Sequence, residues 1–446
     1  MIKEERIRKL NSNSFQKNEF ILYWMQASQR IEYNHAFEYA KILSNKYEKP
    51  LVIYFGLTDN YPEANLRHYS FMLEGLIELK KDFEKQNISF IIKHISPESG
   101  AVDLGKKACL VIVDSGYLKI QRYWRNFAAK KIKCPLIEVE SDVIVPVREA
   151  SVKEEYSAAT LRPKIQNKIP IFLKQISKVK IENNFREFNV DSLDISNKNK
   201  LLSSMNIDKS VKPVKKIIGG TGQAKKKLKI FIKEKLDKYA DEKNYPNKNY
   251  LSNLSSYLHF GQISPVFIGI EILKSDSPSK ESFLEELIIR RELAINYVFY
   301  NPNYDSFDGL PEWAKISLKK HESDNRQYQY NLEDFENAET HDSYWNAAQK
   351  EMIKTGKMHG YMRMYWGKKI LQWTKDVKQA FRIAIFINNK YEIDGRDPNS
   401  YAGVAWCFGK HDRPWKERPI FGKIRYMSKN GLDRKFSMKE YVDKNI

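Results

Sequence analysis

The chain has 446 residues, enough for two or three domains and a large hydrophobic core. Its 76 Lys and Arg outnumber 56 Asp and Glu, and the net charge of +20 would attract polyanions such as nucleic acid, although a lysine-rich solvated surface carries similar charge. Three cysteines without CxxC spacing, a charged start and no long apolar run argue against a disulfide framework, a structural zinc site, a secretion signal and a membrane span.

The first 145 residues alternate short apolar runs with amphipathic segments of helical spacing. The runs expected to form strands are "EFILYWM", "PLVIYFGL", "ISFIIKHI", "CLVIVD" and "PLIEVES". Strands that alternate with helices predict right-handed crossovers and a parallel sheet, so we expect an α/β domain over residues 1–150. No GxGxxG follows the first strand, so no dinucleotide site is expected there.

Residues 151–218 lack lasting periodicity and are expected to be a connector with little regular structure. From Gly219 onward the pattern is mostly helical and predicts a compact all-α domain over residues 219–446. The long helices expected are Ala224–Tyr239, Lys280–Tyr300, His341–Thr355, Met358–Thr374 and Val377–Asn388.

Several short motifs carry little chemistry on their own. "GGTGQAKKKLKIF" lacks the ending of a phosphate-binding loop and reads as a glycine-rich turn into a helix, whose start could still hold an anion. "DGRDPN" lacks the alternating acids and closing Glu of a calcium loop. The pair His411–Asp412 is too short to indicate a metal hydrolase, so no metal site is predicted.

Two helical segments each allow a structural and a functional interpretation. Arg363, Trp366 and Trp373 share one helix face, which is either a core stripe or a chain of oxidisable indoles. A buried Arg363 needs an anionic partner, for which Asp394 is a candidate. Glu286 lies four residues before Arg290, which suggests either an intrahelical ion pair or a carboxyl group at a pocket wall.

Longer stretches resemble a known family. They are "YWMQASQR", "KEEYSAATLRPKI", "LSNLSSYLHFGQISP", "EELIIRRELAINYVFYNPNYDSFDGLPEWAK", "THDSYWNAAQKEMIKTGKMHGYMRMYWGKKILQW", "NNKYEIDGRDPNSYAGVAW" and "ERPIFGKIRYMS". In order and content they resemble class II cyclobutane pyrimidine dimer photolyases, in the photolyase/cryptochrome superfamily. The resemblance implies a Rossmann-like N-terminal domain with a parallel sheet and an all-α C-terminal domain that binds FAD. It also implies light-driven repair, in which excited reduced FAD donates an electron to a dimer flipped out of DNA.

The resemblance also implies roles for individual residues. Those expected to hold FAD are Tyr239, Leu251, Ser252, Asn253, Leu254 and Ser255 for its phosphates and ribityl chain, Arg363 and Asp394 as an ion pair beside the ring, and Asn388 facing N5. Trp345, Trp366 and Trp373 are expected to relay electrons. The residues expected at the lesion or its strand are Lys243, Asn244, Glu286, Arg290, Met364, Trp406, Asp412 and Trp415. Trp406 would stack on the dimer and Glu286 would hydrogen-bond its pyrimidine edge.

Two other functions are compatible with parts of this pattern. A cryptochrome-like photoreceptor shares the fold but often carries a C-terminal extension, whereas this chain ends soon after "GKIRYMS". A basic nucleic-acid-binding protein without catalysis would not need the flavin residues. We therefore expect a monomeric, cytoplasmic repair enzyme, associated with the nucleoid if prokaryotic, that acts on UV-damaged DNA. An antenna chromophore such as a deazaflavin is a possibility within the family.

Overall fold

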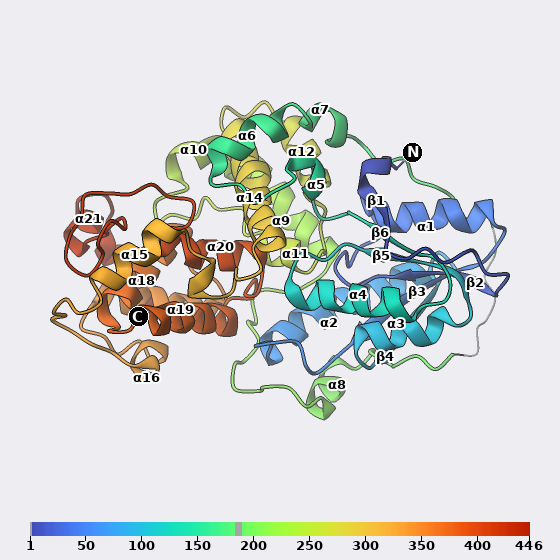
Figure 1. Cartoon of the computed structure of the whole chain (residues 1–446), viewed down its shortest axis with the longest axis horizontal. Coiled ribbons are helices and arrows are strands. Elements are labelled where there is room, and N and C mark those ends of the chain that lie inside the picture. The colour runs from blue at the N-terminus through green and yellow to red at the C-terminus, as the bar shows by residue number, and fades with distance from the viewer. Residues whose placement is uncertain (1, 183–189) are drawn as a thin grey trace.

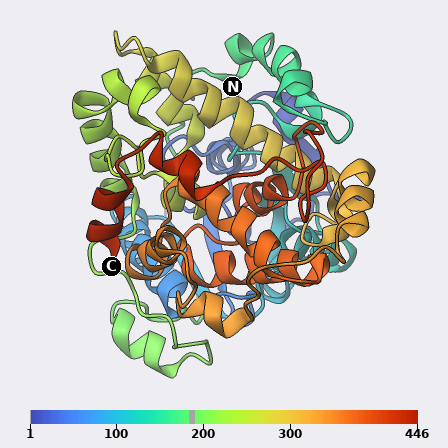
Figure 2. The same cartoon turned by 90° about the vertical axis from the view of Figure 1, so that its left-hand side faces the viewer.

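The computed structural model describes residues 2–182 and 190–446, and they form two halves side by side. The sheet and its helices lie on the right of Figure 1, and a mass of helices lies on the left. Figure 2 views the helical half face-on, with the sheet behind it. The expected fold class, an α/β region followed by a helical region, is confirmed.

One six-stranded sheet, in the order β1-β6-β5-β2-β3-β4, organises the first half. Its strands are β1 (Ile7–Lys9), β2 (Phe20–Trp24), β3 (Leu51–Leu57), β4 (Ser89–His94), β5 (Ala108–Asp114) and β6 (Leu136–Val139). Its helices are α1 (His35–Lys46), α2 (Leu66–Glu84), α3 (Pro97–Gly105) and α4 (Lys119–Lys131). Every residue of β2, β3 and β5 is buried, which explains why these strands are unbroken apolar runs.

Two elements of this half carry no clear sequence signal. Strand β1 pairs antiparallel with β6, whereas the other pairings are parallel. Its three residues, "IRK", are partly exposed at the sheet edge, so they lack the apolar pattern of a buried strand. Helix α3 begins at Pro97 and has only nine residues, too few for a persistent helical period.

The expected connector contains more regular structure than its composition suggests. It holds α6 (Ala158–Gln166), α7 (Ile169–Phe172) and α8 (Lys198–Ser204), preceded by α5 (Val147–Ala150). Helix α6 buries Leu161 and Ile165 in the core cluster that also contains α9. The expectation of little structure was therefore wrong for these segments, and residues 183–189 lie outside the described residues.

The second half is helical, as expected. Its helices are α9 (Thr221–Glu234), α10 (Tyr239–Glu242), α11 (Ser255–His259), α12 (Pro265–Leu273), α13 (Lys280–Leu284), α14 (Arg291–Tyr300), α15 (Glu312–Lys320), α16 (Leu332–Glu336), α17 (Ser343–Thr355), α18 (Gly360–Trp373), α19 (Val377–Tyr391), α20 (Pro398–Cys407), α21 (Lys429–Asp433) and α22 (Met438–Asn445). The segment expected to be one helix over 280–300 is interrupted by a π-helix, η3 (Glu285–Arg290). No helix among the described residues is both long and apolar enough to cross a membrane.

The glycine-rich turn before α9 does not leave a free anion site, contrary to one expectation. The backbone N–H of Gly222 donates to Glu78 Oε1 at 2.8 Å, and that of Gly219 donates to Glu74 Oε2 at 2.7 Å. Both carboxylates come from α2, so the first half itself supplies the negative charge at the start of α9.

One arginine connects the two halves through hydrogen bonds. Arg67 of α2 donates to four carbonyl oxygens, those of Lys212 (3.0 Å), Met352 (3.3 Å), Ile353 (2.6 Å) and Tyr391 (2.5 Å). These carbonyls belong to the connector, to the last turns of α17 and to the end of α19. A single buried guanidinium therefore satisfies carbonyl groups from three separate segments.

Candidate active site

A cavity of about 450 Å³ opens in the helical half. Its lining includes these residues expected to hold FAD or the lesion: Tyr239, Lys243, Asn244, Leu251, Ser252, Leu254, Ser255, Glu286, Arg363 and Asp394. They come from α10, the turn before α11, the π-helix, α18 and the loop after α19. Segments separated by more than 150 residues thus converge on one volume, which lies in the size range of cofactor pockets.

The turn expected to hold phosphates presents hydroxyl groups and a strained backbone. Ser252 and Ser255 line the cavity, and Asn253 between them has a positive φ of 57°. The Asn253 side chain accepts a hydrogen bond from Lys357 Nζ at 2.9 Å. Lys357 also lines the cavity and places a cation beside the turn, although its role was missed from the sequence.

Arg363 has a different hydrogen-bonding partner from the one expected. Its Nη2 donates to Glu392 Oε1 at 3.0 Å, and no ion pair within 4 Å joins it to Asp394 among the described residues. Burial acts to lower the pKa of Arg363, but Glu392 and Asp394 together raise it above its ordinary value. The interaction with Asp394 is therefore electrostatic rather than a direct hydrogen-bonded pair.

Several buried polar atoms in this region have no partner among the described residues. They are Arg363 Nε, Asp394 Oδ1, Asn388 Oδ1 and Glu392 Oε2. Asn388 is 1% exposed on α19 and is not part of the cavity lining, although its amide nitrogen approaches Asn389 Oδ1 at 3.4 Å. Unpaired buried polar groups are costly, so this set fits a cofactor that supplies both donors and acceptors.

The π-helix shapes the opposite wall of the cavity. Glu286 pairs with Lys243 Nζ at 2.9 Å, and Arg290 pairs with Glu285 at 3.3 Å. The intrahelical Glu286–Arg290 pair considered from the sequence was therefore wrong, because a π-helix spaces residues differently from an α-helix. A π-helix within a longer helix is frequent at functional sites.

The residues expected at the lesion lie along the edge of this wall. The Arg290 guanidinium stands 5.5 Å from the ring centroid of Trp406, which is half-buried at the end of α20. Trp415 is 41% exposed and is flanked by the guanidinium groups of Arg413 and Arg425 at 5.5 and 5.2 Å. Both tryptophans offer aromatic surface that solvent can reach.

The remaining two residues of this group have mainly local contacts. Asp412 Oδ1 accepts from the Trp415 indole N–H at 3.3 Å and from the Arg413 backbone at 2.8 Å. Met364 packs against the core of the helical half as a partly buried side chain. Neither residue lines the cavity, and their expected contact with the lesion or its strand stays a prediction.

Three indoles form a contiguous buried stack beneath the site. Trp345 of α17 lies parallel to Trp366 with a centroid distance of 6.3 Å, and edge-on to Trp373 at 6.2 Å. All three are at most 3% exposed. Trp345 therefore bridges the two indoles of α18, and the order in space is Trp366, Trp345, Trp373. Gln349, which the sequence did not reveal, accepts from the Trp366 indole N–H at 2.9 Å.

Comparisons with known proteins match the whole chain. The protein is 47% identical to the deoxyribodipyrimidine photo-lyase of Methanothermobacter thermautotrophicus over 100% of this chain and 98% of that protein. It is 38% identical to the protein of the same name from Potorous tridactylus over 99% of this chain and 84% of that protein. The family model described as DNA photolyase matches residues 21–179.

The chain belongs to the DNA photolyase family.

The fold agrees with solved structures of other photolyases. The crystal structure of a bacterial class III photolyase from Agrobacterium tumefaciens superposes with a TM-score of 0.74, covering 97% of this chain and 87% of that one. The sequence identity is only 16%, so this likeness concerns the fold alone.

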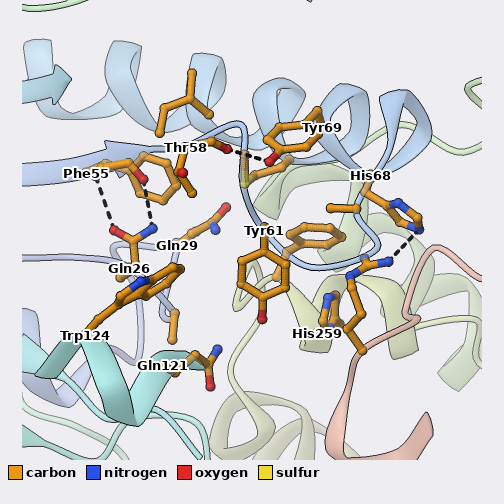
Figure 3. A pocket seen from close by; sticks show the side chains of 17 residues that line it. Gln26, Gln29, Phe55, Thr58, Tyr61, His68, Tyr69, Gln121, Trp124 and His259 are labelled. Atoms are coloured by element: carbon orange, nitrogen blue, oxygen red, sulfur yellow. Dashed lines mark hydrogen bonds between the residues drawn. The ribbon is translucent and has the colours of Figure 1, made fainter. Parts of the chain in front are cut away.

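This photolyase-family chain has a second pocket, shown in Figure 3, at the contact between its two halves. It lies beyond the carboxyl ends of β2 and β3, and its lining includes Gln26, Thr58, Trp124 of α4 and His259. Strand β2 is flanked by β5 and β3, so the strand order reverses here, the usual position of ligand crevices in open α/β sheets. Tyr61 stands edge-on to Trp124 at 5.9 Å, and the remaining cavity is about 80 Å³.

Proposed function

We propose that this enzyme binds FAD in the cavity of its helical half and repairs cyclobutane pyrimidine dimers in DNA with light. The observation that carries the proposal is the set of unpaired buried polar atoms on the cavity residues Arg363 and Asp394, together with that of Asn388 on α19. The name shared by full-length relatives supports the same activity. When bound and reduced, FAD supplies the light absorption and the electron that splits the cyclobutane ring.

The protein's task at the cofactor is to bind and orient it. We assign the phosphates and ribityl chain to Tyr239 and to the turn Leu251–Ser255, whose serines and Lys357 offer donors and positive charge. Arg363 and Asp394 are assigned to the polar edge of the ring, and Asn388 to N5. Because Asp394 is buried and the Arg363 side chain is only 18% exposed, they would act on the ring at low dielectric, where fixed charges have their largest effect.

We assign the DNA lesion to the wall formed by the π-helix and the end of α20. Trp406 offers a flat surface for the flipped dimer, and Arg290 over its ring adds a cation next to that surface. Glu286, which is 44% exposed, and Lys243 beside it present an acceptor and a donor toward a pyrimidine edge. Trp415 with Arg413 and Arg425 suits the strand beside the lesion, since phosphates and bases both find partners there.

The indole stack is assigned to the supply of electrons to oxidised flavin. Trp366, Trp345 and Trp373 are packed ring to ring, and burial excludes water from the contacts between them. Such a stack could also be simple core packing. The assignment therefore depends on variants that keep the packing and remove the indole.

The deciding experiment combines a spectrum with a repair assay. Purified protein should carry about one FAD per chain that is released on denaturation. After reduction, it should restore a thymine-dimer oligonucleotide under blue or near-UV light and not in the dark. A well-folded sample that takes up no FAD, or a loaded sample without light-dependent repair, would contradict the proposal. A cryptochrome-like photoreceptor corresponds to the second of these outcomes.

We also propose the pocket of Figure 3 as the site of an antenna chromophore such as a deazaflavin. Its position at the reversal of strand order and its aromatic lining suit a flat heterocycle. A cavity of about 80 Å³ is too small for three fused rings, so Tyr61 and Trp124 must move apart on binding. Reconstitution with a deazaflavin should add its absorption band to the spectrum of the folded protein, and a spectrum without that band would contradict the assignment.

A further inference from the structure

A third ionisable group accompanies Arg363 and Asp394 at the flavin cavity. Glu392 follows α19 and is 0% exposed. Its Oε1 accepts from the Met358 backbone N–H at 2.9 Å and from Arg363 Nη2 at 3.0 Å. Its Oε2 is buried and has no donor among the described residues. One oxygen of this carboxyl group is therefore fixed in place, while the other lacks a hydrogen bond.

A second carboxyl group, that of Asp394, lies close to Glu392. Asp394 lies close enough to Glu392 for the two carboxyl groups to act on each other directly, and Asp394 Oδ1 also has no donor among the described residues. Two ionised carboxylates in contact in a buried site repel each other, so such pairs commonly share one proton. A proton on Glu392 would give it a donor and would give Asp394 a hydrogen bond to accept.

The electrostatic surroundings place that proton on Glu392 rather than on Asp394. Burial and the neighbouring Asp394 raise the pKa of Glu392 well above its ordinary value, although Arg363 opposes them. Burial also acts to raise the pKa of Asp394, but Arg363 and Lys357 outweigh it and hold that pKa below its ordinary value. Nearby cations therefore prevail at Asp394, whereas burial and the negative charge of Asp394 prevail at Glu392.

We propose that Glu392 is a positioning residue that carries a proton in the flavin site and donates it to a hydrogen bond with Asp394. This inference rests on the proposed function, because it assigns a role to Glu392 toward bound FAD. With Glu392 neutral, the cations Arg363 and Lys357 face a single negative charge on Asp394. The surplus positive charge matches the negative charge of the anionic reduced form of FAD, so protonation of Glu392 favours the reduced cofactor.

Other groups also act on Glu392, and any pH test must account for them. Arg67 of α2 and Tyr441 of α22 interact with it electrostatically, but neither has a pKa near neutral: burial lowers the pKa of Arg67 only to about 10, and it raises that of Tyr441 well above its ordinary value. Lys357 also needs a control, because burial lowers its pKa below the ordinary value and so brings its titration closer to the tested pH range. A Lys357→Arg variant, which fixes this charge, is therefore measured alongside.

The test uses holoprotein in equilibrium with a redox dye at fixed potential between pH 6 and 9. In the wild type, and in Lys357→Arg, reduction takes up one proton more than in Glu392→Gln. The ratio of reduced to oxidised FAD should then fall more steeply with rising pH than in Glu392→Gln, by up to a further factor of ten per pH unit. This difference should appear at pH values between the pKa of Glu392 with oxidised FAD and its pKa with reduced FAD. Glu351→Gln, a buried carboxyl that instead accepts from Tyr441 and the His359 N–H, is the matched control and should behave as the wild type.

Infrared difference spectra of the same samples provide a readout independent of the potential. A carboxylic-acid C=O band that changes on flavin reduction should disappear in Glu392→Gln and persist in Glu351→Gln. Equal pH dependence in the wild type and Glu392→Gln, with no acid band lost, would overturn the proposal. If Glu392→Gln does not fold, Asp394→Asn must shift the wild-type acid band, and an unshifted band is the contrary result. Failure to take up FAD contradicts the proposed function, whereas full FAD content with an ionised Glu392 contradicts this inference alone.

Discussion

Two groups of tryptophans in the helical half use the same side chain in opposite surroundings. Trp345, Trp366 and Trp373 are at most 3% exposed and contact one another, whereas Trp406 is half-buried and Trp415 is 41% exposed, each with a guanidinium group over its ring. Closed packing without water suits electron transfer between rings. An accessible face beside a cation suits stacking on a base. The environment, rather than the residue type, therefore separates the two proposed roles.

The largest effect is expected when an indole of the buried group is truncated. Trp345→Ala should lower the free energy of unfolding by about 3–5 kcal/mol, because it leaves a cavity where Trp366, Trp373 and Phe335 now contact the ring. Urea unfolding measures this loss. A cost below about 1 kcal/mol would mean that the stack is not part of the rigid core, and the comparison between the two groups would fail.

A substitution that keeps an aromatic ring separates a role in electron transfer from a role in core packing. Trp366→Phe should slow photoreduction of oxidised FAD while repair by chemically pre-reduced enzyme is largely kept. It also leaves Gln349 Oε1 without its donor, at a cost of about 1–3 kcal/mol. Trp24→Phe is the matched control, since Trp24 is fully buried in the first half and donates to Gln26 at 3.1 Å. Equal photoreduction rates in both variants would leave only the packing role.

In the accessible group, Trp406→Ala should weaken binding to dimer-containing DNA by about 1–3 kcal/mol, the value of one base–aromatic stack. Binding to undamaged DNA should change little, because it depends mainly on Lys and Arg and keeps its salt dependence. Both affinities, FAD content and melting temperature are measured on one preparation. A parallel loss of all four would assign Trp406 to the core instead.

Acid should lower the free energy of unfolding through His411, whose ring lies 5.8 Å from that of Trp406 in the accessible group. Burial lowers the pKa of His411 to about 3, so the unfolded chain, with a His pKa near 6.5, takes up this proton first. Its contribution to stability is complete above pH 6.5 and is lost as the pH falls toward 3, by about 1.4 kcal/mol per pH unit. Urea unfolding of His411→Gln should show a shallower acid loss than the wild type, and parallel curves would be the contrary result.

The smallest effect is expected at Trp415, the most exposed of the five. Trp415→Ala should change the free energy of unfolding by no more than about 0.5 kcal/mol, as for most surface substitutions. It should reduce affinity for damaged and undamaged DNA to a similar, modest extent. A selective loss of lesion affinity here, as large as that in Trp406→Ala, would move the stacking role from one tryptophan to the other.

Helices and strands with a clear local periodic pattern were predicted correctly from the sequence. The buried strands β2, β3 and β5 and the helices α17, α18 and α19 lie close to their expected positions, since unbroken apolar runs and helical spacing survive without tertiary information. The cavity residues came from resemblance to a family, because no local pattern brings Tyr239 and Asp394 together. The π-helix was missed, since the residues in and after it are buried on nearly all sides and leave no amphipathic pattern whose phase could reveal an extra residue.

The errors at the site have a common physical cause. Charge alone suggested Asp394 as the hydrogen-bonded partner of Arg363, but the path of the chain after α19 places Glu392 there. In the sequence, Glu392 precedes "IDG" and reads as part of a polar turn. Its carboxyl group is held by Met358 and Arg363, which lie 34 and 29 residues earlier in the chain, so no local pattern reveals its position.

The hydrogen bonds from Arg67 to four carbonyl groups bear on whether the two halves could fold independently. If the helical half were separated from the first half, the carbonyl groups at the ends of α17 and α19 would lose their donor, the Arg67 guanidinium. These are the helices that carry Trp345 and Asn388. We therefore expect the sheet half and the helical half to fold and unfold together rather than as independent domains. An exchange of sheet domains between relatives would have to carry this arginine and its carbonyl partners as a matched set.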